Sequence, residues 1–231
     1  MSEKRNSFSK TAQSGNAMVY VLIIIGLFAA LSYTLSRQTD TGEAGALSEE
    51  QAAIYASNLI SQSMQVRQRI DQMTRGGIAI DDLDFMKPDD ADFDEPRVHL
   101  KVFHPHGGGV VLPRLQEGVR AQINTNPPPG WYLGRFNNVA WTPGNGDDVI
   151  LVAHQLSESI CARINERITG NADIPVMTDP ARILLIDHEE STAPSNDDLT
   201  EVTCEDCEGY PFLCVRDSEG AYSLYNLVGI Q

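Results

Sequence analysis

The chain has 231 residues, of which 17 are basic and 32 acidic, giving a formal net charge of −15. The phosphates of nucleic acid and the headgroups of anionic lipids would be repelled by such a chain, so the composition argues against both as partners. The charge itself favours solubility and identifies no partner.

A long apolar segment lies near the N-terminus. Residues 17–36 read AMVYVLIIIGLFAALSYTLS, without a charged residue or a proline. A helix of about 20 such residues can cross the hydrocarbon core of a bilayer. Lys4, Arg5 and Lys10 precede the segment and acidic residues follow it, so the positive-inside rule places the N-terminus in the cytoplasm. A cleaved secretory signal, with a shorter apolar region and a small-x-small site, is the less favoured alternative.

These features divide the chain into four parts. Residues 1–15 form a basic cytoplasmic leader and residues 16–37 a transmembrane helix. Residues 38–47 form a hinge, because they contain two glycines and no apolar pattern. Residues 48–231 form an exported globular domain.

The exported domain begins with an amphipathic helix. Ser48 and Gln51 have the spacing of a capping box, and the acidic residues between them suit the positive end of the helix dipole. Apolar residues recur at helical spacing as far as Met73, and Gly76 and Gly77 end the helix. The pattern predicts a helix of about 28 residues.

The rest of the domain predicts one further helix and several short strands. The helix is expected over residues 152–168, and strands over residues 98–103, 131–139, 148–152, 202–204, 212–216 and 222–228. The fold class is therefore α+β: a long N-terminal helix, first membrane-spanning and then amphipathic, packed on a small antiparallel-sheet domain with one further helix.

All four cysteines, Cys161, Cys204, Cys207 and Cys214, follow the apolar segment. An even number in an exported domain indicates two disulfides, although the sequence alone does not separate the three connectivities. We favour a bond from Cys161 to one of the C-terminal cysteines, which would tie the second helix to the final sheet. The other two would then close a local loop around residues 209–211.

Metal and redox sites are the alternatives for these cysteines. Cys204-x-x-Cys207 could bind zinc together with Cys214 and His188. The acidic neighbours of the two close cysteines oppose the thiolate that a redox pair needs. Structural disulfides are the preferred interpretation.

Two other polar clusters could bind a metal. Asp90-x-Asp92-x-Asp94 begins like an EF-hand calcium loop, but the sixth position is Glu95 and the twelfth is Lys101, so it is not an EF-hand. A solvated acidic loop is the preferred interpretation, and calcium binding is the alternative. Three histidines lie nearby, and a polar turn explains them as well as a metal would: His99, His104 and His106. The sequence contains no nucleophile elbow and no phosphate-binding glycine loop, so we predict no enzymatic activity and no cofactor.

The architecture resembles the type IV pilin superfamily, which includes pilins, minor pilins and the pseudopilins of type II secretion. The likeness is carried by the short basic leader, by Ser14-Gly15 before the apolar run, and by the run from Ala17. The segment CARIN at residues 161–165 and the cysteine-containing C-terminal strands are also similar to pilin domains. In that family a prepilin peptidase cuts after such a glycine, which implies processing between Gly15 and Asn16.

Two departures qualify the resemblance. The family usually has a glutamate at the fifth mature position, where this chain has Tyr20, and an apolar first mature residue, where this chain has Asn16. Some minor pseudopilins also lack the glutamate. The resemblance therefore implies a minor rather than a major structural subunit.

The partners implied by the resemblance are other pilin-like subunits, contacted through the N-terminal helix, together with the inner membrane and the prepilin peptidase. The protein would sit in the bacterial inner membrane with a single pass and a periplasmic C-terminal domain, or in a filament or its tip. The alternative is a signal-anchored periplasmic binding or scaffold protein that is never processed or assembled.

Overall fold

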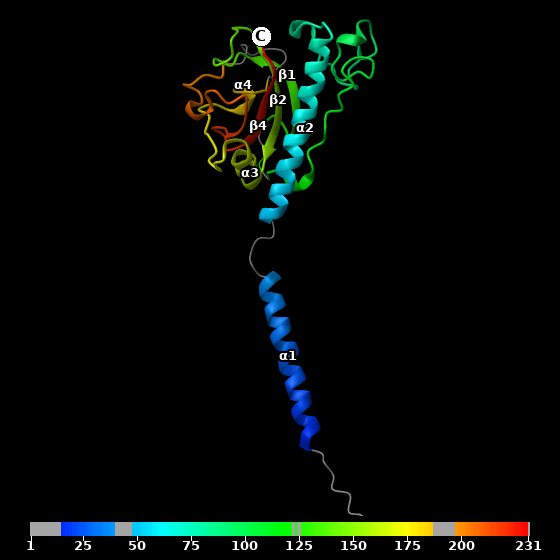
Figure 1. Cartoon of the computed structure of the whole chain (residues 1–231). Helices are drawn as coiled ribbons and strands as arrows, with labels where there is room; N and C mark the ends of the chain where they lie inside the picture. The colour runs from blue at the N-terminus through cyan, green and yellow to red at the C-terminus, as the bar shows by residue number, and fades with distance from the viewer. Residues whose placement is uncertain (1–14, 40–47, 122, 124–125, 187–196, 231) are drawn as a thin grey trace, which may run out of the picture. The chain divides into compact units, whose positions relative to one another are not determined.

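The computed structural model describes residues 15–39, 48–121, 123, 126–186 and 197–230 (Figure 1). The chain divides into two compact units, Met1–Ala46 and Leu47–Gln231. The described part of the first unit is helix α1 (Gly15–Thr39), whose side chains are described from residue 18 to residue 32. The predicted leader up to residue 14 and residues 40–47 of the predicted hinge lie outside the described residues.

The second unit opens with helix α2 (Glu49–Arg75). The predicted capping box is confirmed, because the backbone N–H of Gln51 donates to Ser48 Oγ at 3.3 Å and the backbone N–H of Ser48 donates to Gln51 Oε1 at 3.4 Å. Its buried residues recur every three or four positions, so one stripe of the helix faces the domain. They are Ala52, Ala56, Leu59, Ser63, Val66, Ile70 and Met73.

A four-stranded antiparallel sheet forms the centre of the domain, in the order β1-β2-β4-β3. The strands are β1 (Gly130–Asn137), β2 (Asp148–Leu156), β3 (Phe212–Arg216) and β4 (Tyr222–Gly229). The predicted α+β class with a small antiparallel sheet is therefore confirmed at this level. A tight turn joins β3 to β4, and Asp217 Oδ1 accepts the backbone N–H groups of Glu219 at 3.0 Å and Ala221 at 2.8 Å.

Both faces of the sheet are covered. Helices α2 and α3 (Glu158–Thr169) pack on one face, where Leu151 and Ala153 of β2 join their apolar cluster. On the other face, Ile150 and Val152 of β2 pack with the short helix α4 (Ala181–Leu184) and the segment around Leu199. The strand thus alternates between two cores, and each of its residues is buried. Figure 1 shows β2 within the sheet, with α2 and α4 labelled beside it.

That double burial explains one error of the sequence analysis. Residues 152–156 belong to β2 rather than to the second helix, which begins only at Glu158, after Ser157. A strand buried on both faces shows a continuous apolar run instead of strict alternation, and such a run is easily mistaken for part of a helix.

Two predicted strands are wrong. Residues 98–103 contain the short 3-10 helix Val98–Leu100, followed by a single bridge between Asp84 and Lys101. Residues 202–204 lie in a turn that leads into the 3-10 helix Glu205–Cys207. Neither segment forms a sheet ladder, and Val202 of the second one is 85% exposed.

Candidate functional site

The predicted processing residues lie at the first turn of α1. Gly15 and Asn16 are the first two residues of that helix, and the leader residues 1–14 are outside the described part of the chain. The side chain of Asn16 is likewise not among those described. Cleavage between Gly15 and Asn16 therefore stays a prediction.

Helix α1 presents apolar side chains to the outside over its described length. Met18 is 78% exposed, and Leu22 and Phe28 are each 68% exposed. At Gly26, a Cβ would meet no side chain or other described segment within 4 Å. Within the described residues, no helix has both the length and the mean hydropathy that a membrane span requires.

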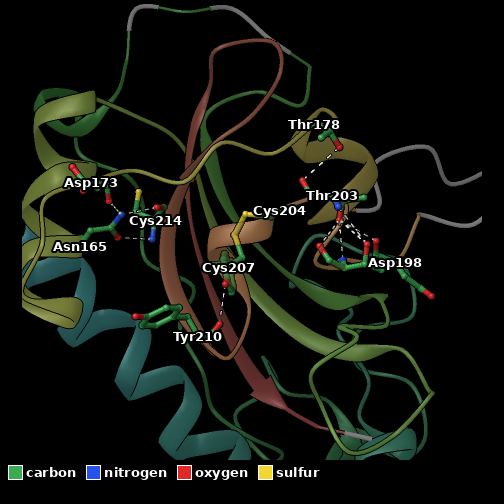
Figure 2. Close-up of a disulfide and its surroundings, with 11 residues drawn as sticks. Asn165, Asp173, Thr178, Asp198, Thr203, Cys204, Cys207, Tyr210 and Cys214 are labelled. Carbon is green, nitrogen blue, oxygen red and sulfur yellow. Dashed lines mark hydrogen bonds between the residues drawn. A yellow bond between two sulfur atoms is a disulfide. The ribbon is translucent and has the colours of Figure 1, made fainter.

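The cysteines form two disulfides. Cys161 of α3 pairs with Cys214 of β3, with 5.4 Å between their Cα atoms, so the expected link from the second helix to the final sheet is present. Cys204 pairs with Cys207, with 5.3 Å between Cα atoms (Figure 2). The second pairing differs from the expected loop around residues 209–211, because a 3-10 turn brings these two side chains together.

These disulfides are structural in their surroundings. All four cysteines are buried, with exposed fractions of 1% or less, which places their sulfurs away from solvent thiols. Since every one of these sulfurs is bonded to another, the thiolates needed for the zinc alternative are not present; its fourth candidate ligand, His188, lies outside the described residues.

Beside the disulfide between Cys161 and Cys214, the side chain of Asn165 forms hydrogen bonds with the edge of the sheet. Its Nδ2 donates to the backbone oxygen of Cys214 and its Oδ1 accepts the backbone N–H of the same residue, both at 2.8 Å (Figure 2). The same Nδ2 also donates to the backbone oxygen of Asp173 at 2.8 Å. Asn165 lies within the segment that carried part of the family resemblance, but nothing in the sequence indicated this role.

Backbone hydrogen bonds fix the turn that contains the disulfide between Cys204 and Cys207. The N–H of Tyr210 donates to the oxygen of Cys207 at 3.1 Å, and the N–H of Thr178 donates to the oxygen of Thr203 at 2.9 Å (Figure 2). The hydroxyl of Tyr225 donates to the backbone oxygen of Tyr210 at 2.8 Å, and burial raises the pKa of this hydroxyl. The Tyr225 side chain therefore stays neutral, and its hydroxyl contributes a hydrogen bond that supports this turn.

The acidic loop that resembles a calcium site contains a cation of the protein itself. Lys101 as a residue is only 3% exposed. Its ammonium donates to the backbone oxygen of Phe93 at 2.9 Å and to that of Asp92. Lys101 occupies the position where an EF-hand supplies its bidentate glutamate. The loop is thus organised around an ammonium bound by main-chain carbonyl groups.

The histidines do not gather into a metal site. His104 is buried, its Nε2 lies 3.2 Å from Asp94 Oδ1, and its Nδ1 accepts the backbone N–H of His106 at 3.1 Å. His99 and His106 are exposed. Among the described residues, no three His, Cys, Asp or Glu side chains are placed to hold a metal ion.

No model of a known protein family, no curated protein and no solved structure matches this chain.

Proposed function

We propose that this chain is a minor pilin-like or pseudopilin-like structural subunit of a bacterial envelope filament or secretion machine. Helix α1 would hold it in the inner membrane, and the disulfide-braced domain would lie in the periplasm. Its activity is assembly with neighbouring subunits, and no catalytic step is involved.

The exposure of the apolar helix α1 is the observation that carries the proposal. Burying a large apolar side chain contributes about 1.5–3 kcal/mol, so a row of such side chains left in water is strongly unfavourable. Lipid chains and the apolar helices of other subunits are the surroundings that such a helix fits. Gly26 and Ala30 have the small-xxx-small spacing that permits close contact between helices.

The two disulfides support the exported location of the domain. Disulfides persist in the bacterial periplasm and are rare in the cytoplasm, where thiols are kept reduced. The bond between Cys161 and Cys214 joins α3 to the sheet, and the bond between Cys204 and Cys207 stiffens the opposite face. A rigid domain suits a subunit that must keep its shape while it is moved out of the membrane.

The missing acidic residue gives the subunit a minor role in the proposal. Tyr20 supplies no carboxylate to a neighbouring N-terminal amine, so self-assembly through α1 would be weak. A partner subunit bearing that acid would be needed. The alternative, a signal-anchored periplasmic scaffold or binding protein, shares the anchor and the disulfides but keeps its leader.

Intact-mass measurement of membrane-extracted protein separates these two functions. For a pilin-like subunit, we expect the mass of a chain that begins at Asn16. The variant Gly15→Leu should keep residues 1–15, whereas Gly26→Ala, a glycine substitution in the same helix, should be processed normally. A leader retained by the wild-type chain in cells that contain prepilin peptidase would contradict the proposal and favour the alternative.

A further inference from the structure

A shallow groove runs along the exposed side of α2. Its volume is about 420 Å³, and it lies between the helix and the segment 109–113. One wall consists of polar side chains of the helix, including Gln65, Arg69 and Gln72. The other wall includes Val111, an apolar side chain that is 85% exposed among the described residues.

The C-terminal part of α2 is basic, although the chain as a whole is strongly acidic, and Arg69 of this part lines the groove. Arg67, Arg69 and Arg75 lie in the last three turns of the helix, where Asp71 is the one acidic residue. None of these arginines takes part in an ion pair within the described residues. Arg69 donates instead to Gln72 Oε1 at 3.1 Å, so its positive charge is not balanced by a carboxylate.

The opposite charge is concentrated in the segment that follows α2. Residues 81–95 contain eight acidic side chains and one lysine. In the described part of the chain, the exposed carboxylates of Asp89, Asp92 and Glu95 accept no hydrogen bond and form no ion pair. The backbone of this loop is held by the buried ammonium of Lys101, so it can bind a partner without first being ordered.

We propose that the acidic loop 89–95 of one copy docks into the α2 groove of a second copy. Asp89 and Asp92 would meet Arg69, and the loop would cover Val111. Within the described part of one chain no ion pair joins the loop to Arg69, so the proposed contact is between copies. Opposite charges of this kind determine register and speed of encounter more than affinity.

The heights of the loop and the groove determine the form of the assembly. The loop is tied to Lys101, whose backbone oxygen accepts the N–H of Gly108. A Cβ on Gly108 would lie 2.7 Å from Met73 Sδ, which puts this part of the domain level with the last turn of α2. The groove is centred about one and a half turns earlier, near Gln68. Subunits of a filament share one orientation, and this step rests on the proposed function. A neighbour must then be displaced along α2 by about 7.5 Å, at 1.5 Å per residue.

A displaced contact of this kind joins different surfaces of the two copies. Such heterologous contacts do not close on themselves unless they form a ring, so they generate an open stack of subunits. The loop of each copy would then bind the groove of the next copy, and this contact between domains would add to any contact made by α1.

Charge reversal in the full-length, detergent-extracted protein tests this contact. Two differently tagged copies are co-expressed, and their co-purification is measured. Arg69→Glu in both copies should lower co-purification about threefold to fivefold, the size expected for one exposed ion pair. A copy with Arg69→Glu paired with a copy carrying Asp89→Lys and Asp92→Lys should regain association. Arg167→Glu, an equally exposed substitution on α3, is the matched control and should have no effect.

A second variant and a mass measurement make every outcome decisive. Val111→Glu places an anion in the groove opposite the acidic loop, so charge repulsion should weaken docking while the exposed position leaves folding intact. Loss of association that the charge exchange does not restore, or an Arg69→Glu protein that behaves like the control, would overturn the docking proposal. A retained leader in the same sample would contradict the proposed function alone.

Discussion

The side-chain amide of Asn165 pairs with both backbone groups of Cys214, at 2.8 Å for each hydrogen bond. Since β3 is an edge strand, this amide takes the place of a neighbouring strand at that position. Two residues further along, Arg216 exchanges backbone hydrogen bonds of 2.8 Å with Pro175 and Met177. The outer edge of β3 is therefore occupied by the chain's own groups, which protects it from pairing with another strand.

Replacing Asn165 should be costly. In Asn165→Leu, the buried N–H and carbonyl of Cys214 lose their partner, and the carbonyl of Asp173 loses one hydrogen bond, so we expect a loss of about 2–4 kcal/mol in the free energy of unfolding. Urea denaturation measures this loss. Asn58→Leu, on the exposed side of α2, is the control and should change stability by less than about 0.5 kcal/mol. Equal effects of the two variants would contradict the role of Asn165.

The two disulfides should contribute unequally. The bond between Cys161 and Cys214 spans 53 residues, and the bond between Cys204 and Cys207 spans three. In the chain-entropy model, removing the first as a double alanine variant costs about 4 kcal/mol and removing the second about 2 kcal/mol. Thermal unfolding of the two double variants should give this order, and the reverse order would mean that local packing around the short bond dominates.

Lys101 should stabilise the acidic loop. Lys101→Met keeps the aliphatic stem but leaves the carbonyl groups of Asp92 and Phe93 without their donor, so we expect a loss of about 1–3 kcal/mol and faster proteolysis within residues 87–96. Lys87→Met, in the exposed part of the same loop, is the matched control. Cleavage at the same rate in both variants would show that the ammonium does not hold the loop.

Tyr225 should make the protein sensitive to alkali. Burial raises the pKa of its hydroxyl above the ordinary value of 10.0. The unfolded chain therefore loses this proton first, and stability that is complete below about pH 10 falls as the pH rises further. For one such proton the slope is about 1.4 kcal/mol per pH unit. Tyr225→Phe should reduce that slope in urea denaturation between pH 9 and 11, although Tyr132 and Tyr222, whose pKa values are also raised by burial, keep part of it.

A larger side chain at Gly26 should weaken association with partner subunits without disturbing the chain itself. Because a Cβ at this position would meet no side chain or other described segment within 4 Å, Gly26→Ile should not disturb the chain itself. Against a closely packed neighbouring helix the same change should reduce co-purification with partner subunits. Leu22→Ile is the control in the same helix. Unchanged co-purification in Gly26→Ile would argue against helix contact through the Gly-xxx-Ala spacing.

The sequence alone determined the elements whose signals are local. The capping box at Ser48 and Gln51, the glycine stop after Arg75 and the turn between β3 and β4 each depend on residues a few positions apart. Strand β3 was placed over its observed residues for the same reason. The even number of cysteines likewise indicated two disulfides, because pairing in an exported domain depends on composition and compartment.

Only the tertiary structure decided the rest, because those features depend on residues far apart in the chain. The pairing of Cys161 with Cys214, and the amide of Asn165 on the same strand, arise when α3 packs against β3. The start of α3 was misplaced because burial of β2 between two cores removes the alternation that identifies a strand. The sequence already excluded an EF-hand in the acidic loop, but only the tertiary structure shows that the ammonium of Lys101 binds the main-chain carbonyl groups of Asp92 and Phe93.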